Sequence, residues 1–223
     1  MHEIYLNFHG LGTPPARVAS EEIIYWLEAE RFFTILKLID DLRPDQQRIC
    51  ITFDDGNKSD IKVALPILKD FNRTAWFFPS SEFLGEPDYL TANDLILLRD
   101  AGMEIGSHGT AHARWTDLSD AQLNCELKRS IKTLATVLGI NITAVAVPFG
   151  AYDRRVLRIL KHFCLSTVFT SDQGWAKPNA WLKPRTTIRA DTTLEFIERL
   201  CTGRLSQRQR LRFFLRRWKR RLR

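Results

Sequence analysis

The sequence predicts an α/β fold, a distorted (β/α) barrel of about seven parallel strands in a single domain, and two observations support it. Apolar, β-prone runs alternate with helical patterns at least six times, as is typical of a parallel sheet. Polar side chains directly follow these runs. In a closed sheet they would gather at one rim, where barrel enzymes build their active sites. A doubly wound open sheet is the alternative.

The expected strands are short apolar segments. They cover residues 4–8, 48–53, 74–78, 103–106, 144–147 and 165–170. Helical spacing of apolar side chains predicts helices over residues 61–68 and 91–101. The longest expected helix begins at Ser119, which forms a capping box with Gln122, and it ends at Gly139.

The charge of the chain is divided unevenly between a body and a tail. Of the net charge of +7, residues 204–223 hold ten Lys and Arg and no acid, so residues 1–203 carry −3. We therefore expect a catalytic domain over residues 1–203 and a basic tail over residues 204–223. Because the basic charge lies in the tail, no nucleic-acid partner is expected for the body. The oligomeric state is left open.

The tail has the pattern of a basic amphipathic helix. Its apolar side chains form one helical stripe among arginines, and the stripe consists of Leu211, Phe214, Leu215, Trp218 and Leu222. An anionic membrane surface is a candidate partner for such a helix. A solvated extension is one alternative, and a helix packed on the body with its arginines outward is the other.

The expected localisation rests on two features that the sequence lacks, a signal peptide and a membrane-spanning segment. The first residues show no signal-peptide pattern, and no stretch is long and apolar enough to span a membrane. The four cysteines form no Cys-x-x-Cys pair and are expected to be buried free thiols; they are Cys50, Cys125, Cys164 and Cys201. These features favour the cytoplasm, with a peripheral place on a membrane as the variant that the tail suggests.

Two short segments hold residues suited to a metal site: Thr52-Phe53-Asp54-Asp55-Gly56 and Ser107-His108-Gly109-Thr110-Ala111-His112. One carboxylate and two imidazoles can hold a divalent cation, while the second carboxylate stays free as a base. The spacing of His108 and His112 predicts a helical turn that presents both rings to one side. Alone, each segment could be an ordinary turn or a surface pair. Together, at two strand ends, they indicate metal-assisted hydrolysis.

These motifs resemble those of the metal-dependent polysaccharide deacetylases, carbohydrate esterases that share a chitin-deacetylase-type domain. The resemblance implies that Asp54 is the general base and that Asp55, His108 and His112 are the metal ligands. Pro148-Phe149-Gly150 resembles the third motif of the family, which lines the site and supplies a backbone N–H to the oxyanion. Zinc is the first choice for the metal, while cobalt, nickel, manganese and iron remain open.

The chain departs from the common pattern of that family. Val147 stands where an arginine usually contacts the base, and Gly109 stands where Ser or Thr usually follows the first histidine. We expect Arg185, on a late strand, to replace the arginine; an ordinary surface arginine is the alternative. The late histidine that usually protonates the departing amine is missing. His9, at the end of the first strand, resembles the acid of the permuted branch that includes poly-N-acetylglucosamine deacetylases.

The expected activity is removal of an N-acetyl, or alternatively an N-formyl, group from an amino sugar in a glycan or lipid-linked saccharide. Two other functions stay open: a non-catalytic glycan-binding module on the same fold, and a deacylase of a non-sugar amide. Four tryptophans could offer stacking faces to a sugar, but burial is expected for at least two of them; they are Trp76, Trp115, Trp175 and Trp181.

Overall fold

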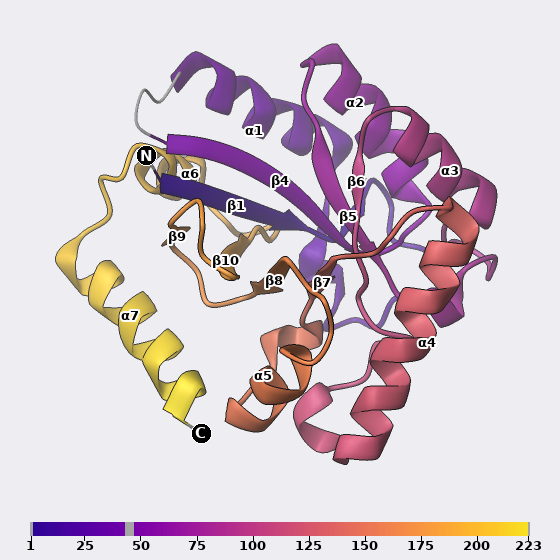
Figure 1. The fold of residues 1–223 in the computed structure, drawn as a ribbon. Coiled ribbons are helices and arrows are strands. Elements are labelled where there is room, and N and C mark those ends of the chain that lie inside the picture. The colour runs from indigo at the N-terminus through magenta and orange to yellow at the C-terminus, as the bar shows by residue number, and fades with distance from the viewer. Residues whose placement is uncertain (1, 43–46, 223) are drawn as a thin grey trace.

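The computed structural model describes residues 2–42 and 47–222, in which seven parallel strands form a nearly closed barrel inside a ring of helices (Figure 1). The strands are β1 (His2–Phe8), β4 (Gln47–Asp55), β5 (Ala75–Pro79), β6 (Glu104–Ile105), β7 (Ala144–Ala146), β8 (Thr167–Thr170) and β10 (Leu182–Thr187). They pair in the order β6-β5-β4-β1-β10-β8-β7. An isolated parallel bridge joins Ser107, just after β6, to Val145 in β7. The two edges of the sheet therefore meet, which confirms the predicted barrel.

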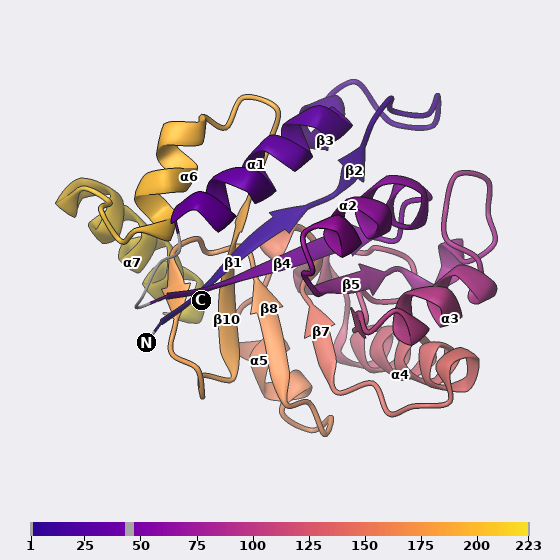
Figure 2. The same cartoon turned by 90° about the horizontal axis from the view of Figure 1, so that it is seen from above.

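Helices cover the outside of the barrel (Figure 2). They are α1 (Ala29–Leu42), α2 (Leu65–Asp70), α3 (Ala92–Asp100), α4 (Asp120–Leu138), α5 (Arg154–Leu160), α6 (Leu194–Cys201) and α7 (Gln207–Leu222). Neighbours pack as the pairs α6 with α1, α3 with α4, α4 with α5 and α5 with α7. The capping box of Ser119 and Gln122 opens α4, and Gly139 ends it in the left-handed conformation, as predicted. A second capping box opens α3.

The side chains of β1 alternate between the outer core and the barrel interior. Ile4, Leu6 and Phe8 belong to the cluster packed beneath the helices. Tyr5 lies in the interior, with its ring 5.1 Å from that of Phe169. Because successive side chains of a strand point to opposite faces, the odd-numbered residues after Tyr5 continue along the interior. The inward-facing side chains of β1 therefore continue up to the rim of the barrel, where the candidate site lies.

Three short strands were not expected from the sequence. They are β2 (Gly10–Leu11), β3 (Trp26–Leu27) and β9 (Trp175–Ala176), and two residues are too few to show a repeating pattern. The expectation of buried cysteines was wrong for Cys125 and Cys164, which are exposed; Cys201 is buried and Cys50 half-buried. Cys125 is exposed because it lies on the solvent side of α4, between the buried Leu123 and Leu127. Within the described ranges, no helix is long and apolar enough to cross a membrane.

The predicted tail helix forms as α7, but its packing matches neither sequence-based alternative. Phe213 is buried against the body, whereas four residues of the predicted apolar stripe are exposed: Leu211, Phe214, Leu215 and Trp218. The side chain of Leu222, the fifth residue of that stripe, lies outside the part that the structure describes. Two arginines turn toward the body: Arg220 pairs with Asp172, and Arg217 bonds the backbone carbonyl of Gln173. The helix therefore packs on the body with some arginines inward and its larger apolar face exposed.

Candidate active site

The carboxyl ends of the strands bring the candidate residues into one pocket. Asp54 and Asp55 end β4, His9 follows β1, and the loop after β6 carries His108 and His112. All five line the same pocket, as does Phe149, which follows β7. Parallel strands end at a common rim, so segments far apart in sequence meet there.

Three side chains of this pocket form a cluster suited to a metal ion. One donor atom each of Asp55, His108 and His112 lies within 4.8 Å of the other two. Asp55 Oδ1 is 3.3 Å from His112 Nε2 and 3.6 Å from His108 Nε2. This oxygen is buried and has no hydrogen-bond partner in the described part of the chain. A buried carboxylate oxygen facing two imidazole nitrogens fits a divalent cation.

The environment of His108 favours the form that can bind a metal. Its Nδ1 lies 2.9 Å from the carbonyl oxygen of Ala146, so Nδ1 donates and Nε2 keeps its lone pair toward Asp55. Burial lowers the pKa of His108 to about 4, although the nearby Asp54 carboxylate acts in the opposite direction. The ring is therefore neutral at neutral pH, as metal ligation requires.

The predicted helical turn between His108 and His112 is wrong. Residues 108–112 form an irregular loop in which Gly109 and His112 have φ of 86° and 52°. Helix α4 supports this loop, because Glu126 Oε1 accepts hydrogen bonds from the backbone N–H groups of Thr110 (2.7 Å) and Ala111 (2.9 Å). A Cβ atom at Gly109 would lie 2.7 Å from the same carboxylate oxygen. The rings converge through loop geometry, not helical spacing.

Asp54 is held in place by Arg185 and Asn7. Arg185 Nη1 and Nη2 donate to Asp54 Oδ1 (2.6 Å) and Oδ2 (2.7 Å), and Asn7 Nδ2 donates to Oδ2 at 2.9 Å. Arg185 is fully buried, so the surface alternative does not hold. Burial by itself raises the pKa of Asp54, but the charge of Arg185, followed by His108, holds this pKa below its usual range. Asp54 is therefore ionised beside the metal-ligand cluster.

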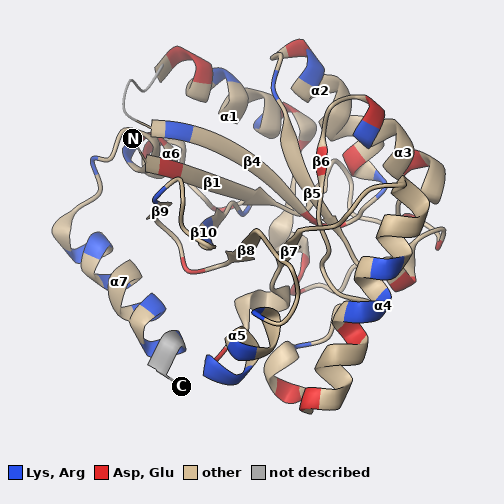
Figure 3. Ribbon diagram, in the orientation of Figure 1, with Lys and Arg blue, Asp and Glu red and all other residues tan. Residues whose placement is uncertain are grey.

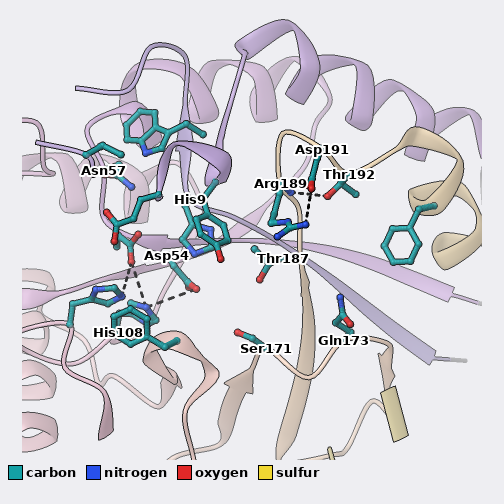
Figure 4. A pocket seen from close by; sticks show the side chains of 18 of the residues that line it. His9, Asp54, Asn57, His108, Ser171, Gln173, Thr187, Arg189, Asp191 and Thr192 are labelled. Atoms are coloured by element: carbon teal, nitrogen blue, oxygen red, sulfur yellow. Dashed lines mark hydrogen bonds and ion pairs between the residues drawn. The ribbon is translucent and has the colours of Figure 1, made fainter. Parts of the chain in front are cut away.

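His9 lies on the side of the pocket next to Asp54 (Figure 4). It continues the inward alternation of Tyr5 and Asn7, and its ring packs 5.1 Å from that of Tyr25. Its Nδ1 is buried and has no partner in the portion of the chain described. The next residue is glycine because the Trp26 ring packs directly on the backbone: a Cβ atom at Gly10 would be 2.1 Å from it.

The third motif contributes one residue to the pocket wall. Phe149 has φ of 56°, is half-exposed, and packs its ring 4.5 Å from that of His112. Pro148 and Gly150 are buried and do not belong to the pocket lining. They shape the turn that presents Phe149.

Sequence reasoning missed several residues of the pocket. From the His108 side the pocket continues past His9 to Thr187 and Arg189 (Figure 4). Its aromatic lining consists of Tyr25, Trp26, Phe83, Tyr89, Phe149, Phe196 and Phe213. None of the four tryptophans considered as stacking faces lines it, and Trp115 is fully buried. These aromatic residues come from separate short elements and from α6 and α7, so no single sequence pattern joins them and only the fold could reveal this lining.

A third carboxyl group, Asp60, lies behind the site. It is buried, and neither of its side-chain oxygens has a partner in the ranges described. Burial raises the pKa of Asp60 well above its ordinary value, and the charges of Asp55 and Asp54 raise it further. These effects favour the protonated form, which adds no negative charge beside the ligand cluster.

Comparison with known families agrees with this geometry. The family described as polysaccharide deacetylase matches residues 41–168. The chain belongs to the polysaccharide deacetylase family. The matched range includes both predicted ligand motifs and the third motif, Pro148-Phe149-Gly150.

Two curated proteins extend this comparison. YxkH of Bacillus subtilis, named among the polysaccharide deacetylases, is 26% identical over 181 residues, which are 77% of this chain and 65% of YxkH. Chitin deacetylase 1 of Cryptococcus neoformans var. grubii is 25% identical over 126 residues, 56% of this chain and 26% of that protein. The chain thus spans less than two thirds of the length of each relative.

Solved structures share the fold of this member of the polysaccharide deacetylase family. The deacetylase PplD of Streptococcus pyogenes, in complex with acetate, has a TM-score of 0.78 at 21% identity and covers 90% of this chain and 98% of its own. IcaB from Ammonifex degensii has a TM-score of 0.76 at 19% identity, with coverages of 90% and 97%. The barrel is therefore common to these proteins despite low sequence identity.

Proposed function

We propose that the protein removes the acetyl group from an N-acetylated amino sugar in a glycan or lipid-linked saccharide, with a divalent metal as cofactor. The formyl group is the alternative acyl group. One observation carries the proposal: the converging donor atoms of Asp55, His108 and His112 lie beside an ionised, arginine-bound Asp54 in one pocket. Membership in the polysaccharide deacetylase family supports the substrate class.

The donor set suits the proposed cofactor. Two imidazoles and a carboxylate are ligands that zinc accepts with a position left open, and cobalt, nickel, manganese or iron can use the same set. A divalent cation held by Asp55, His108 and His112 would polarise the amide carbonyl and make the attacking water more acidic.

Asp54 is the proposed general base. Its carboxylate is fixed at both oxygens by Arg185 and so stays oriented while it takes a proton from the attacking water. Its low pKa makes Asp54 a weak base. The reaction should therefore depend strongly on the cofactor that acidifies the water.

The other side of the amide would be served by Phe149 and His9. The backbone of Phe149, in a left-handed conformation at the pocket wall, is the proposed donor to the oxyanion. His9 is the proposed acid that protonates the departing amine. Its buried Nδ1 in the same pocket supports this role.

Metal content and acetate release test the proposal together. The purified chain should bind about one metal ion, release acetate from an N-acetylhexosamine substrate, and lose activity with a chelator. His112→Ala should lose the metal and the activity. His162→Ala is the matched control, because His162 is exposed and outside the pocket lining. Unchanged metal content in the His112 variant would refute the ligand assignment.

We also propose that α7 docks on an anionic membrane surface from the cytoplasmic side. Its outer face exposes four large apolar side chains; they are Leu211 (57%), Phe214 (62%), Leu215 (48%) and Trp218 (54%). Basic residues surround this face and no acid interrupts it (Figure 3). Apolar insertion and attraction to anionic lipids support docking by such a helix.

A further inference from the structure

The inner side of α7 forms part of the catalytic pocket. Four of its residues line the same pocket as the ligand cluster; they are Gln209, Arg212, Phe213 and Arg216. The basic helix is thus a wall of the site as well as a surface feature. Arg212 and Arg216 lie one helical turn apart, so their side chains project to the same side.

Specific contacts hold this wall in place. Asp172, which is 1% exposed, accepts a hydrogen bond from Arg220 Nη1 at 2.9 Å. The other oxygen of Asp172 accepts from Tyr152 Oη at 2.6 Å, which fixes the carboxylate. Phe213 is buried next to Gly174, where a Cβ atom would lie 3.4 Å from its ring. These contacts set the position of Arg212 and Arg216 relative to the pocket.

Neither Arg212 nor Arg216 forms an ion pair within the described ranges. Arg216 makes only a long contact of 3.5 Å to Gln173 Oε1. Burial lowers the pKa of Arg216 and the like charge of Arg220 lowers it further, although the Asp172 carboxylate, which is paired with Arg220, acts in the opposite direction. Two guanidinium groups that line the same pocket wall and form no ion pair of their own make a favourable place for an anion.

Three of the four acidic residues that line the pocket are engaged by residues outside α7, Asp55 in the ligand cluster among them, and Glu22 has no ion pair in the described ranges. Asp191 pairs with Arg189 at 2.8 Å, and Asp54 pairs with Arg185. Glu22 acts electrostatically on Tyr89, whose ring lies under Arg17. The end of the pocket formed by α7 therefore keeps an excess of positive charge.

We propose that Arg212 and Arg216 bind a phosphate group of the substrate, so that the amino sugar to be deacylated is a phosphate ester. The inference rests on the proposed deacylase function and deepens it. Guanidinium groups bind phosphate oxygens through paired, charge-assisted hydrogen bonds. A soluble sugar phosphate and a lipid-linked saccharide present the same group, and the exposed outer face of α7 would bring the second within reach.

The test compares substrates that differ only in the phosphate. The ratio of kcat/KM is measured for N-acetylhexosamine 1-phosphate, and for its prenyl diphosphate-linked form in detergent, against the neutral methyl glycoside. Arg212→Gln combined with Arg216→Gln should lower the phosphate-to-neutral ratio by about tenfold. Arg208→Gln combined with Lys219→Gln removes the same charge from α7 outside the pocket lining and should keep the ratio.

Each outcome bears on the inference. A loss for both phosphate substrates supports recognition of the phosphate itself, and a loss confined to the lipid-linked one supports recognition of a membrane-held phosphate. An unchanged ratio, or an equal loss in the control, overturns the inference. If the native chain deacylates neither substrate class, the proposed function fails. Calorimetric titration with the sugar phosphate then decides: equal Kd for the pocket variant and the control overturns phosphate binding, and about tenfold weaker binding by the pocket variant supports it.

Discussion

At the scale of single residues, this site shows that a guanidinium contact to Asp54, the proposed general base, can come from another strand than the one expected from the family pattern. Val147 is uncharged and cannot form an ion pair with Asp54. Arg185 of β10 forms this ion pair instead, and its guanidinium donates two hydrogen bonds to the Asp54 carboxylate. The exchange works because β10 and β4 both flank β1, so their inward side chains meet across it. Asn7 on β1 completes the arrangement between them.

His9 carries the residue-scale prediction. His9→Asn should keep the metal, because His9 does not belong to the ligand cluster, and should lower kcat by about 10²- to 10⁴-fold, the usual contribution of a general acid. Steady-state kinetics with acetate detection and elemental analysis measure both properties. His162→Asn serves as the control outside the pocket lining. Native-like turnover in the His9 variant would remove this residue from the mechanism.

At the scale of elements, a loop and a helix together make the candidate ligand site. The His108–His112 loop is tied to α4 by Glu126 and by the contact of Ser107 Oγ with Ser130 Oγ at 2.6 Å. Without a regular hydrogen-bond pattern of its own, the loop depends on these contacts for its shape. The strands supply Asp55, but α4 determines where the histidines lie.

Glu126 tests this dependence. Glu126→Ala leaves the N–H groups of Thr110 and Ala111 without their acceptor; for the buried Thr110 this costs about 1–3 kcal/mol, whereas the exposed Ala111 can bond water instead. We expect the affinity for zinc to fall by about 10- to 100-fold, as for other residues that orient metal ligands. Zinc titration with a competing chelator measures this. Glu195→Ala, on the exposed face of α6, is the control, and equal zinc affinities in the two variants would contradict the role of Glu126.

At the scale of the whole molecule, α7 connects the pocket with the outer surface. Its inner side lines the candidate active-site pocket, whereas its outer side exposes apolar residues among basic ones. A helix with these two faces could place the pocket at a membrane. This arrangement accounts for the contrast between the basic tail and the mildly acidic body.

Membrane docking is tested with the full chain. Replacing Leu211, Phe214 and Trp218 by Ser should abolish most co-sedimentation with anionic liposomes, because the inserted apolar area is lost. Binding of the native chain should also weaken with salt, since attraction to anionic lipids is screened. Leu97→Ser is the control, because Leu97 is 56% exposed on α3, away from α7. Native-like sedimentation of the triple variant would exclude docking through this face.

Local sequence patterns were sufficient to predict many of the strands and helices of the fold. The apolar runs that became β1, β4 and β5 and the capping box of Ser119 and Gln122 depend on neighbouring residues alone. Such features are encoded within a few positions and are therefore readable from sequence. The prediction of a helical turn between His108 and His112 was wrong because an i, i+4 spacing of two histidines also occurs in an irregular loop. Here the loop is shaped by its hydrogen bonds to Glu126, which is distant in sequence.

The sequence by itself determined the α/β class, its main strands and helices, and the residue types suited to a metal site, because periodicity and motif spacing are local properties. Closure of the sheet into a barrel rests on the tertiary bridge between Ser107 and Val145. Only the tertiary structure decided that Arg185 reaches Asp54, that Asn7 bridges them, and that α7 turns Arg212 and Arg216 into the pocket. The contacts of Arg185 with Asp54 and with Asn7 each join residues more than a hundred positions apart in the sequence. They depend on strand order and helix packing, which no short stretch of sequence contains.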